Sequence, residues 1–291
     1  MPELPEVETI RRTLADKLIG QEIAGVELLA PKFIRYPTPD EFCARVTGAR
    51  IDGLERRGKY LLFELNTGDR MIVHLMMAGR LLYTPADVPL AKHTHVIFTL
   101  GNGDHLRYID LRHFGGLRLL ASGEEEGLPP GLRRLGPEPL GESFTPAYLR
   151  RVLAGKRGKI KSVLLDQEVI AGLGNIYADE ALFLAAIHPE RPADSLVPAE
   201  VRRLCQAIRQ VLTESIEQGG TTFATYVDGE GKRGRFAAML RVYRRAAEAC
   251  PRCGSPIERR MVGGRSSHFC PRCQKPGRRP PGRGSPRRRR P

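Results

Sequence analysis

The sequence predicts an α+β protein with an N-terminal helix, a β-sandwich, a helical part and a C-terminal β-hairpin that carries paired cysteines. Apolar residues recur at helical spacing in residues 5–19, and Gly20 follows as a natural C-cap. Short β-type runs separated by turns fill residues 22–120. Helical patterns replace them from Pro146 onwards. A helix, a β-rich half and a helical half therefore follow one another along the chain.

The β-sandwich is expected from the number and spacing of the short β-type runs. Seven or eight such strands fit between residues 22 and 120. The clearest of them are residues 60–65, 71–75, 95–100 and 117–120. Residues 66–69 (NTGD) and 101–104 (GNGD) are turn sequences that would close hairpins between neighbouring strands.

The second half divides by composition. Residues 121–145 are rich in Gly, Pro and Glu and predict an interdomain linker, whereas residues 221–240 are polar and Gly-rich, which indicates a mobile loop. The candidate helices are residues 148–153, 161–165, 176–186 and 198–218. We therefore expect five parts: helix and β-sandwich at 1–120, linker at 121–145, helical domain with its loop at 146–240, cysteine-bearing hairpin at 241–275, and a disordered basic tail at 276–291.

The net charge of +14 on 291 residues indicates a polyanionic partner, with nucleic acid first among the candidates. Residues 276–291 carry seven arginines and no acid, which leaves +7 on residues 1–275, so the body is basic without its tail. No secretory leader is expected, because acidic residues stand where its apolar core should be. No run of 18 apolar residues exists, so we expect no membrane association and a cytosolic protein.

Cys250-Pro-Arg-Cys253 and Cys270-Pro-Arg-Cys273 form two C-x-x-C knuckles separated by 16 residues. Four thiolates at this spacing are typical of a closed, tetrahedral zinc site. Closure leaves no coordination position for water, so the metal would be structural. Two disulfides or free thiols are the alternatives, and both fit a cytosolic pair of knuckles poorly.

The first residues, MPELPEVE, place a secondary amine and a carboxylic acid side by side once Met1 is removed. A free Pro2 nitrogen can attack an electrophilic sugar carbon and form an iminium ion, and Glu3 can move protons beside it. The alternative is a plain helix start, with Pro5 at its first position and acids in the first turn. That alternative explains Pro5 but not a second proline at position 2.

Three further motifs carry candidate phosphate ligands. Residues 171–180 (AGLGNIYADE) are a Gly-rich turn that opens a helix, where the glycines would let the backbone approach a phosphate and Asn175 would cap the helix or bond the phosphate. A plain helix–turn–helix with Asn175 as N-cap is the alternative. Lys59 in RRGKYLL and Arg265 in an expected hairpin turn at 263–269 could also bind phosphate. For both, a solvated surface cation is the alternative.

Two strand-like runs end in bulky side chains. Residues 74–77 (HLMM) and 110–116 (DLRHFGG) hold Met77, Arg112 and Phe114, which could be inserted into a base stack as apolar and planar wedges. Core packing of Met77 and Phe114, with a surface salt bridge for Arg112, is the alternative, and the residues by themselves favour it.

Taken together, these motifs resemble the bacterial formamidopyrimidine-DNA glycosylases, also called 8-oxoguanine DNA glycosylases. PELPEVE, RRGKYLL, HLMMAG, DLRHFGG, AGLGNIYADE and the C-x₂-C-x₁₆-C-x₂-C finger follow one another in the family's order, over residues 2–273. The resemblance implies an N-terminal helix and β-sandwich as catalytic domain, a helix–two-turn–helix DNA-binding domain with a lesion-recognition loop, and a zinc finger. It also implies that DNA lies in a cleft between the two halves.

The resemblance implies a bifunctional enzyme of base excision repair that acts on double-stranded DNA with oxidised purines. Pro2 would attack C1′ of the damaged nucleotide, Glu3 would supply or accept protons, and Lys59 would contact the phosphate beside the lesion and assist catalysis. The Pro2 iminium would then allow β- and δ-elimination, so that lyase activity follows glycosylase activity. One structural zinc ion, held by the four cysteines, and no organic cofactor are expected.

The resemblance also implies DNA contacts by residues of both halves. Met77, Arg112 and Phe114 would fill the gap left by the flipped lesion, with Arg112 bonding the orphaned cytosine, while Asn175 and Arg265 would grip the bent backbone. The complete implied DNA-binding set is His74, Met77, Arg112, Phe114, Asn175 and Arg265. We expect a monomer in the bacterial cytoplasm, associated with the nucleoid through DNA.

Three departures from the family pattern leave the catalytic residues in place. His113 stands where the family usually has a second arginine, Met76 precedes Met77, and the tail after Cys273 is longer and more basic. We interpret the tail as a non-specific DNA tether, with a dispensable solubilising tail as the alternative.

Two other functions stay open at this point. An endonuclease VIII-like enzyme for oxidised pyrimidines commonly has glycine in place of Leu4, so the PELPEVE start favours the purine branch. A non-catalytic protein that binds damaged DNA would need neither Pro2 nor Glu3.

Overall fold

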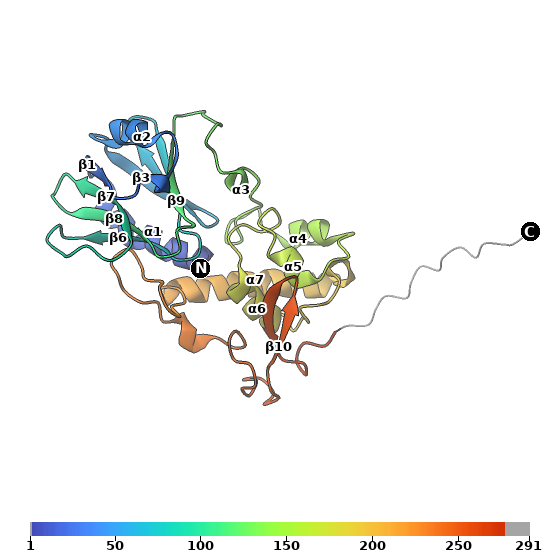
Figure 1. Ribbon diagram of the computed structural model, residues 1–291. Coiled ribbons are helices and arrows are strands. Elements are labelled where there is room, and N and C mark those ends of the chain that lie inside the picture. Colours follow the sequence, from blue (N-terminus) through green and yellow to red (C-terminus); the bar gives the residue numbers. More distant parts are fainter. Residues whose placement is uncertain (1, 277–291) are drawn as a thin grey trace, which may run out of the picture. The chain divides into compact units, whose positions relative to one another are not determined.

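The computed structural model of the chain describes residues 2–276 (Figure 1), and the predicted basic tail lies outside them from residue 277 on. Helices and strands are both present, which confirms the expected α+β class. The described residues form two compact units. The first unit comprises residues 2–143, 166–174 and 209–240, and the second comprises 144–165, 175–208 and 241–276.

The first unit begins with helix α1 (Leu4–Leu18), which buries one face of apolar side chains. Glu3 is the N-cap, and Glu6 completes a capping box by accepting the backbone N–H of Glu3 at 2.8 Å. Gly20 has a φ of +88° just beyond the helix, a conformation that glycine adopts without strain. The helix predicted for residues 5–19 is thus confirmed, shifted by one residue.

Two β-sheets form the predicted β-sandwich. One has the strand order β1-β7-β8-β6 and the other β2-β9-β5-β4-β3, and every pairing is antiparallel except that of β2 with β9. Nine strands rather than seven or eight fill residues 23–120. They are β1 (Ile23–Leu28), β2 (Ile34–Tyr36), β3 (Ile51–Arg57), β4 (Tyr60–Leu65), β5 (Arg70–His74), β6 (Gly79–Thr84), β7 (Thr94–Leu100), β8 (His105–Asp110) and β9 (Gly116–Leu120).

Both predicted hairpin turns are confirmed. Residues 66–69 join β4 to β5, and the N–H of Leu65 donates to the carbonyl of Asp69 at 2.9 Å. Residues 101–104 join β7 to β8 in the same way. Turn chemistry therefore located these two connections from the sequence alone.

The core of the first unit lies between the two sheets and under α1. Phe98 of β7, Phe63 of β4 and Leu14 of α1 are fully buried members of one apolar cluster. Burial of a side chain of this size stabilises the fold by about 1.5–3 kcal/mol. Because α1 packs on β3, β4 and β6, the sandwich fixes the position of the first residues of the chain.

Helix α2 (Pro39–Val46) is not among the predicted elements. Its start signal is present in the sequence, since Thr38 caps the helix with its hydroxyl and Pro39 occupies the first turn. Eight residues, however, are too few for a clear helical period. A four-residue helix, α3 (Pro130–Arg133), lies in the stretch predicted as linker.

The second unit holds the helical part and the cysteine-bearing hairpin. The four predicted helices are present as α4 (Pro146–Leu153), α5 (Ile160–Leu164), α6 (Asn175–Leu184) and α7 (Pro198–Glu217). Helix α7 continues into the first unit after residue 208. Short 3₁₀ turns are η1 (Pro31–Phe33), η2 (Ala193–Ser195) and η3 (Phe236–Met239). Within residues 2–276, none of the helices combines the length and apolar character that crossing a bilayer requires.

Strands β10 (Glu258–Val262) and β11 (Arg265–Phe269) form the hairpin between the knuckles. The turn is Gly263-Gly264, with φ of +56° and +74°, rather than the longer turn expected at 263–269. Two residues suffice because a type I′-like turn needs positive φ at both positions, which glycine supplies.

Candidate active site

Pro2 and Glu3 lie buried at the start of α1, against the segment 172–174 of the same unit. The backbone N–H of Leu4, the residue after Glu3, donates to the carbonyl of Gly172 at 3.1 Å. Glu3 is only 3% exposed, and a Cβ on Gly174 would lie 2.2 Å from its Cδ atom. Only glycine at position 174 therefore leaves room for this carboxyl group.

Gly172 and Gly174 of this segment pack closely against the N-terminal residues. A Cβ on Gly172 would lie 2.7 Å from the Cβ of Leu4, and the space beside Gly174 is filled by Glu3. This packing accounts for both glycines, and the interpretation that they let the backbone approach a phosphate stays a prediction. Both glycines make room for side chains of the N-terminal residues, so that the segment passes closely over the carboxyl group.

Lys59 reaches the same segment from the turn between β3 and β4. Its Nζ donates to the carbonyl of Leu173 at 3.3 Å, and Gln167 Nε2 donates to the same oxygen at 2.8 Å. Gln167 Oε1 also accepts the N–H of Gly172 at 3.0 Å. The structure thus brings the three predicted catalytic residues together around residues 172–174. Gln167, which sequence reasoning missed, holds the backbone on which they meet.

Glu6 is a second buried carboxylate that sequence reasoning missed as a site residue. Its side chain accepts the N–H of Glu3 with Oε2 at 2.8 Å and the N–H of Thr221 with Oε1 at 2.7 Å. The first contact has a sequence signal, because Glu6 stands three residues after the N-cap. The second contact joins positions far apart in the chain, so no sequence signal indicates it. One carboxylate therefore links the residue after Pro2 to the segment 219–240.

The segment 219–240, expected to contain a mobile loop, has defined contacts with α1. The hydroxyl of Thr13 accepts the N–H of Gly229 at 3.0 Å. The buried hydroxyl of Tyr226 donates to the carbonyl of Gly219 at 3.0 Å. These bonds place the segment beside the helix that carries the N-terminal residues.

The cations before Lys59 brace the fold instead of facing solvent. Arg56 pairs with Glu8 at 3.0 Å and with Glu138 at 2.7 Å, and Arg57 pairs with Glu138 at 3.0 Å. Burial alone would raise the pKa of Glu8, but hydrogen bonds from three arginines outweigh it and lower this pKa to about 2. The pairs fasten β3 to α1 and so fix the turn that carries Lys59.

Met77, Arg112 and Phe114 come together at the ends of β5 and β8. Arg112 Nη1 lies 3.9 Å from the sulfur of Met77, and its guanidinium carbon lies 5.1 Å from the centroid of the Phe114 ring. Phe114 is 51% exposed, so core packing is the wrong alternative for it. Buried Asp110 shapes the loop by accepting the N–H groups of Arg112 and Gly115 at 3.0 and 2.9 Å.

His74 ends strand β5 with its ring against Tyr60, at a centroid distance of 4.1 Å. Burial, followed by the charge of Lys59, lowers the pKa of His74 to about 4. The imidazole is therefore neutral at physiological pH. It can donate a hydrogen bond to a phosphate but adds no charge to the site.

Asn175 and Arg265 belong to the second unit. Asn175 begins α6 and donates from Nδ2 to the hydroxyl of Tyr243 at 3.5 Å. Its buried Oδ1 has no hydrogen-bond partner among residues 2–276. Arg265 is exposed at the start of β11, directly after the two-glycine turn.

A buried ion pair fixes the strand that carries Arg265. Lys161 of α5 and Asp179 of α6 are both fully buried, with 2.6 Å between Nζ and Oδ1. Lys161 donates to the carbonyl of Ser266 at 2.6 Å, and Asp179 accepts the N–H of His268 at 2.8 Å. Both partners of the ion pair therefore also hold β11.

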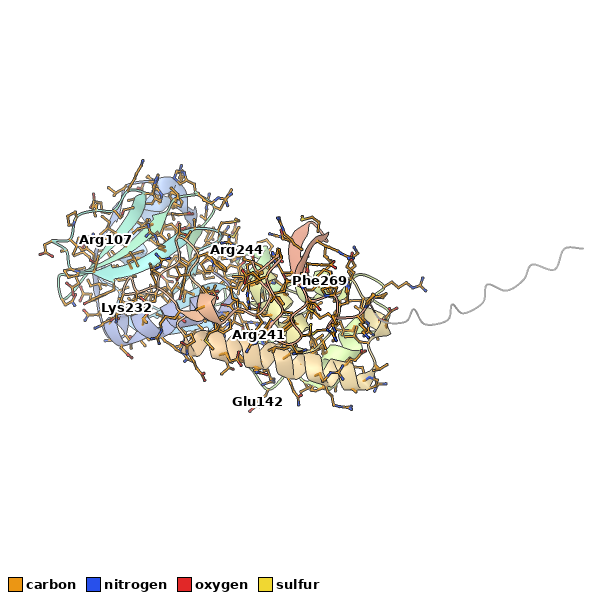
Figure 2. All side chains as sticks on the ribbon, turned by 90° about the horizontal axis from the view of Figure 1, so that it is seen from below. Arg107, Glu142, Lys232, Arg241, Arg244 and Phe269 are labelled. Atoms are coloured by element: carbon orange, nitrogen blue, oxygen red, sulfur yellow. The ribbon has the colours of Figure 1, made fainter. Side chains whose placement is uncertain are left out.

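Glu180 organises the backbone that leads to the cysteines. It is fully buried and accepts the N–H groups of Arg241, Val242 and Tyr243, each at 2.9 Å (Arg241 is labelled in Figure 2). Burial raises the pKa of Glu180 in spite of these bonds. The contact places Tyr243 beside Asn175.

The four knuckle cysteines form one cluster, with all sulfur atoms within 4.8 Å of one another. The sulfur atoms of Cys250 and Cys273 are 3.9 Å apart, and those of Cys253 and Cys270 are 3.5 Å apart. Tetrahedral zinc with Zn–S bonds of about 2.3 Å places its sulfur ligands about 3.8 Å from one another. The donor set and its dimensions therefore fit zinc.

Comparisons with known families match three stretches of the chain. Residues 1–117 match the formamidopyrimidine-DNA glycosylase N-terminal domain, and residues 135–227 match the H2TH domain of the same enzyme. Residues 247–276 match the zinc finger found in FPG and IleRS.

Curated relatives and solved structures agree with these matches. A formamidopyrimidine-DNA glycosylase of Symbiobacterium thermophilum is 54% identical over 94% of this chain and 89% of the relative. The one from Pelotomaculum thermopropionicum is 51% identical over 94% and 99%. The Lactococcus lactis Fpg in complex with an abasic site containing DNA has a TM-score of 0.87 at 39% identity, over 94% and 99%. The FPG protein of Thermus thermophilus has 0.85 at 42% identity, over 95% and 100%.

The fold is that of a DNA glycosylase of base excision repair. The chain belongs to the formamidopyrimidine-DNA glycosylase family. This membership confirms the enzyme predicted from the sequence, a glycosylase for oxidised purines, and DNA as its partner. The predicted zinc finger is confirmed too, and its four cysteines are consistent with one structural zinc ion.

Proposed function

We propose that the chain excises oxidised purines from double-stranded DNA and cuts the strand at the abasic site through a covalent bond to Pro2. The main support is the meeting of Pro2, Glu3 and Lys59 around residues 172–174. An amine, a carboxyl group and a cation at one backbone segment supply a nucleophile, a proton carrier and a phosphate ligand.

Pro2 is the nucleophile of this proposal. With Met1 removed, its secondary amine attacks C1′ while the base leaves with the electrons of the glycosidic bond. The amine then loses its proton, the C1′–O4′ bond breaks, and a C1′=N iminium ion forms. A free α-amine titrates at about 7.7–8.0 in model peptides, so a useful neutral fraction exists near neutral pH. With Met1 attached, the nitrogen is a tertiary amide and cannot attack.

Glu3 moves the protons that these steps require. It lies directly after the nucleophile and is held out of bulk water, at 3% exposure. We assign it proton donation to the sugar oxygen as the ring opens. Loss of the C2′ and C4′ protons from the iminium-bound sugar then expels the 3′ and 5′ phosphates in turn, which completes β- and δ-elimination.

The remaining predicted residues bind DNA in this proposal. Lys59 and His74 contact phosphates beside the lesion, and Asn175 and Arg265 grip the backbone from the second unit. The wedge residues Met77, Arg112 and Phe114 fill the gap left by the flipped base, with Arg112 hydrogen-bonded to the orphaned cytosine. Their exposure and mutual contacts support this assignment.

We assign catalysis to residues 1–120, DNA and lesion recognition to 146–240, and DNA contact through the finger to 241–275. Zinc, when bound, stiffens the hairpin that presents Arg265, and it takes no part in the reaction. We propose a monomer in the bacterial cytoplasm that meets the nucleoid through DNA. Light scattering after gel filtration at micromolar concentration, with and without duplex, tests the oligomeric state.

Borohydride trapping on a duplex with 8-oxoguanine opposite cytosine tests the chemistry. Wild type, shown by mass spectrometry to begin at Pro2, should give a covalent adduct at that residue, and Pro2→Gly should not give the proline adduct. Pro198→Gly, at the exposed start of α7, is the matched control and should trap normally. A parallel thymine glycol duplex tests the oxidised-pyrimidine alternative. Absence of adduct and cleavage in correctly processed wild type would refute the proposal.

A further inference from the structure

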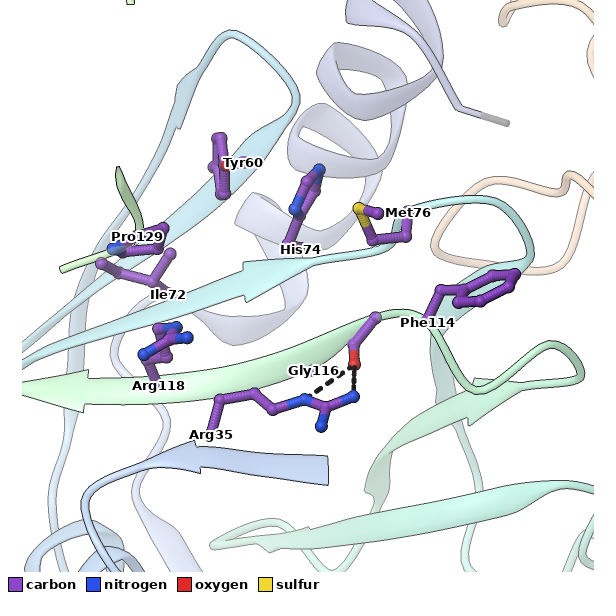
Figure 3. A pocket seen from close by; sticks show the side chains of 10 residues that line it. Arg35, Tyr60, Ile72, His74, Met76, Phe114, Gly116, Arg118 and Pro129 are labelled. Carbon is purple, nitrogen blue, oxygen red and sulfur yellow. Dashed lines mark hydrogen bonds between the residues drawn. The ribbon is translucent and has the colours of Figure 1, made fainter. Parts of the chain in front are cut away.

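A cavity of about 310 Å³ opens beside the wedge residues of the first unit (Figure 3). Arg35 and Arg118 line it together with apolar side chains such as Ile72 and Pro129. None of the described residues that line it is acidic. Small-molecule sites span about 300–1,000 Å³, so the cavity suits a ligand group of nucleotide size.

The two guanidinium groups are held in place without being neutralised. Arg35 donates from Nε and Nη2 to the carbonyl of Gly115 at 3.3 and 3.0 Å, as the dashed lines in Figure 3 show. Arg118 donates from Nη1 to the carbonyl of Gly127 at 2.8 Å. Within residues 2–276 neither side chain pairs with a carboxylate. Backbone carbonyls fix the direction of each guanidinium but leave its full positive charge in the cavity.

The two arginines also act on each other. Burial, and after it the charge of Arg35, lowers the pKa of Arg118. An arginine stays charged in spite of such a shift, so two like charges face one cavity. An anion between them would relieve this repulsion.

The location of the cavity selects the source of the anion. Phe114 of the wedge and His74 line the same space, and Tyr60 in its wall directly follows Lys59 in the chain. His74 is neutral, so the two arginines supply the positive charge of the lining. The apolar walls suit the sugar and base that accompany a phosphate better than they suit a free inorganic ion.

We infer that the cavity is a phosphate-binding site for a nucleotide of the bound DNA, with Arg35 and Arg118 as its ligands. The fork of a guanidinium matches the oxygens of a phosphate, and free N–H donors remain on both side chains. The inference rests on the proposed function, because it assumes that DNA passes over the wedge residues. Arg118 carries no sequence signal of this role, since it stands among leucines in strand β9, just beyond the DLRHFGG motif.

The test measures binding without chemistry. The affinity for a duplex with a tetrahydrofuran abasic analogue is followed by fluorescence anisotropy over a series of salt concentrations. Arg118→Gln should lower the magnitude of the slope of log K against log salt by about 0.9, the value for one phosphate contact. Arg118→Lys should keep the wild-type slope, because it keeps the charge. Arg50→Gln is the control, since Arg50 is exposed and pairs with Asp52 at 2.7 Å.

Arg35→Gln repeats the test from the other side of the cavity, and a melting curve for each variant establishes that the fold is kept. A second arm titrates deoxycytidine monophosphate into DNA-free wild type and Arg118→Gln by calorimetry. Loss of mononucleotide binding with an unchanged DNA slope would overturn the assignment to bound DNA and point to free nucleotides instead. Unchanged slopes together with no mononucleotide binding would overturn the inference.

The outcome is separable from that of the proposed function. Borohydride trapping of wild type reports the proposed chemistry, whereas the salt slopes of the Arg118 variants report binding alone. Absence of trapping in wild type would refute the proposed chemistry and leave the salt slopes readable.

Discussion

Gly174 leaves no room for a methyl group beside Glu3, which makes Gly174→Ala a sharp test of the active site. The added Cβ would lie 2.2 Å from the carboxyl carbon and 2.5 and 2.6 Å from its two oxygens. Unbonded carbon atoms ordinarily approach to about 3.5 Å, so the carboxyl group must move by more than about 1 Å. The φ of Gly174 lies outside the left-handed region, so its backbone accepts alanine.

The expected loss follows from this displacement. A misplacement of about 1 Å at a reacting group costs on the order of 100-fold in rate, and a general acid or base contributes about 10²–10⁴-fold. We therefore expect Gly174→Ala to excise 8-oxoguanine about 100-fold more slowly. Replacement of glycine by alanine stabilises by about 0.4–1 kcal/mol through the unfolded chain, which offsets part of the local strain. The melting temperature should change little.

The assay is single-turnover excision at saturating protein, so that DNA affinity does not enter the rate. Gly25→Ala in β1 is the control, because its Cβ would meet no atom within 4 Å. The control should keep the wild-type rate. A wild-type rate in Gly174→Ala with an unchanged melting curve would show that the position of Glu3 does not limit the reaction.

Four further predictions address other parts of the molecule. Glu6→Gln weakens two charge-assisted bonds, so urea unfolding should show a loss of about 1–3 kcal/mol and single-turnover excision should slow; a full rate would exclude a positioning role. Lys161→Met removes the cationic partner of the buried Asp179 carboxylate, so chemical denaturation should show a loss of about 3–5 kcal/mol; adding Asp179→Leu should recover only part of it, because the N–H of His268 then loses its acceptor. Removal of zinc by a strong chelator, or Cys250→Ser, should weaken duplex binding by anisotropy, and unchanged affinity would contradict a structural role of the finger. The pKa of His74 is about 4 in the folded protein and about 6.5 in the unfolded chain. Between these pH values only the unfolded chain takes up the proton, so the free energy of unfolding should fall as the pH drops from about 6.5 to 4. An NMR titration of His74 with a midpoint near 6.5 would contradict this.

Local patterns predicted most of the fold, because strands, turns and helices have periods that can be read over a few residues. The turns at 66–69 and 101–104 were placed by their Asn, Gly and Asp residues, and α1 by its apolar spacing. Helix α2 was not predicted, because its eight residues have an N-cap but are too few to show a clear helical period. The sandwich has more strands than predicted, because a short edge strand such as β2 depends on its neighbours more than on its own sequence.

The residues of the candidate site likewise fall into those that local sequence predicts and those that only long-range contacts reveal. Pro2 and Glu3 could be proposed from the chemistry of adjacent residues, as could the zinc ligands from their spacing. Glu6 binding to Thr221 joins positions at opposite ends of the sequence, and no local pattern reports such a contact. The same is true of Gly174, whose glycine signal indicated close approach without saying that Glu3 fills the space.

The division into two units predicts which variants should change the excision rate and which should change the affinity for DNA. Pro2, Glu3 and Lys59, and the side chains that hold residues 172–174, all belong to the first unit, whereas Asn175 and Arg265 belong to the second. Changes in the first group should therefore lower the rate at saturating protein, and changes in the second should lower affinity with that rate kept. Gly174 and Asn175 are neighbours in the chain but fall on opposite sides of this division. We expect Gly174→Ala to lower the excision rate and Asn175→Ala to lower the affinity for DNA. Because the two positions are adjacent in the chain, this pair would distinguish catalysis from DNA binding more clearly than two variants at distant positions.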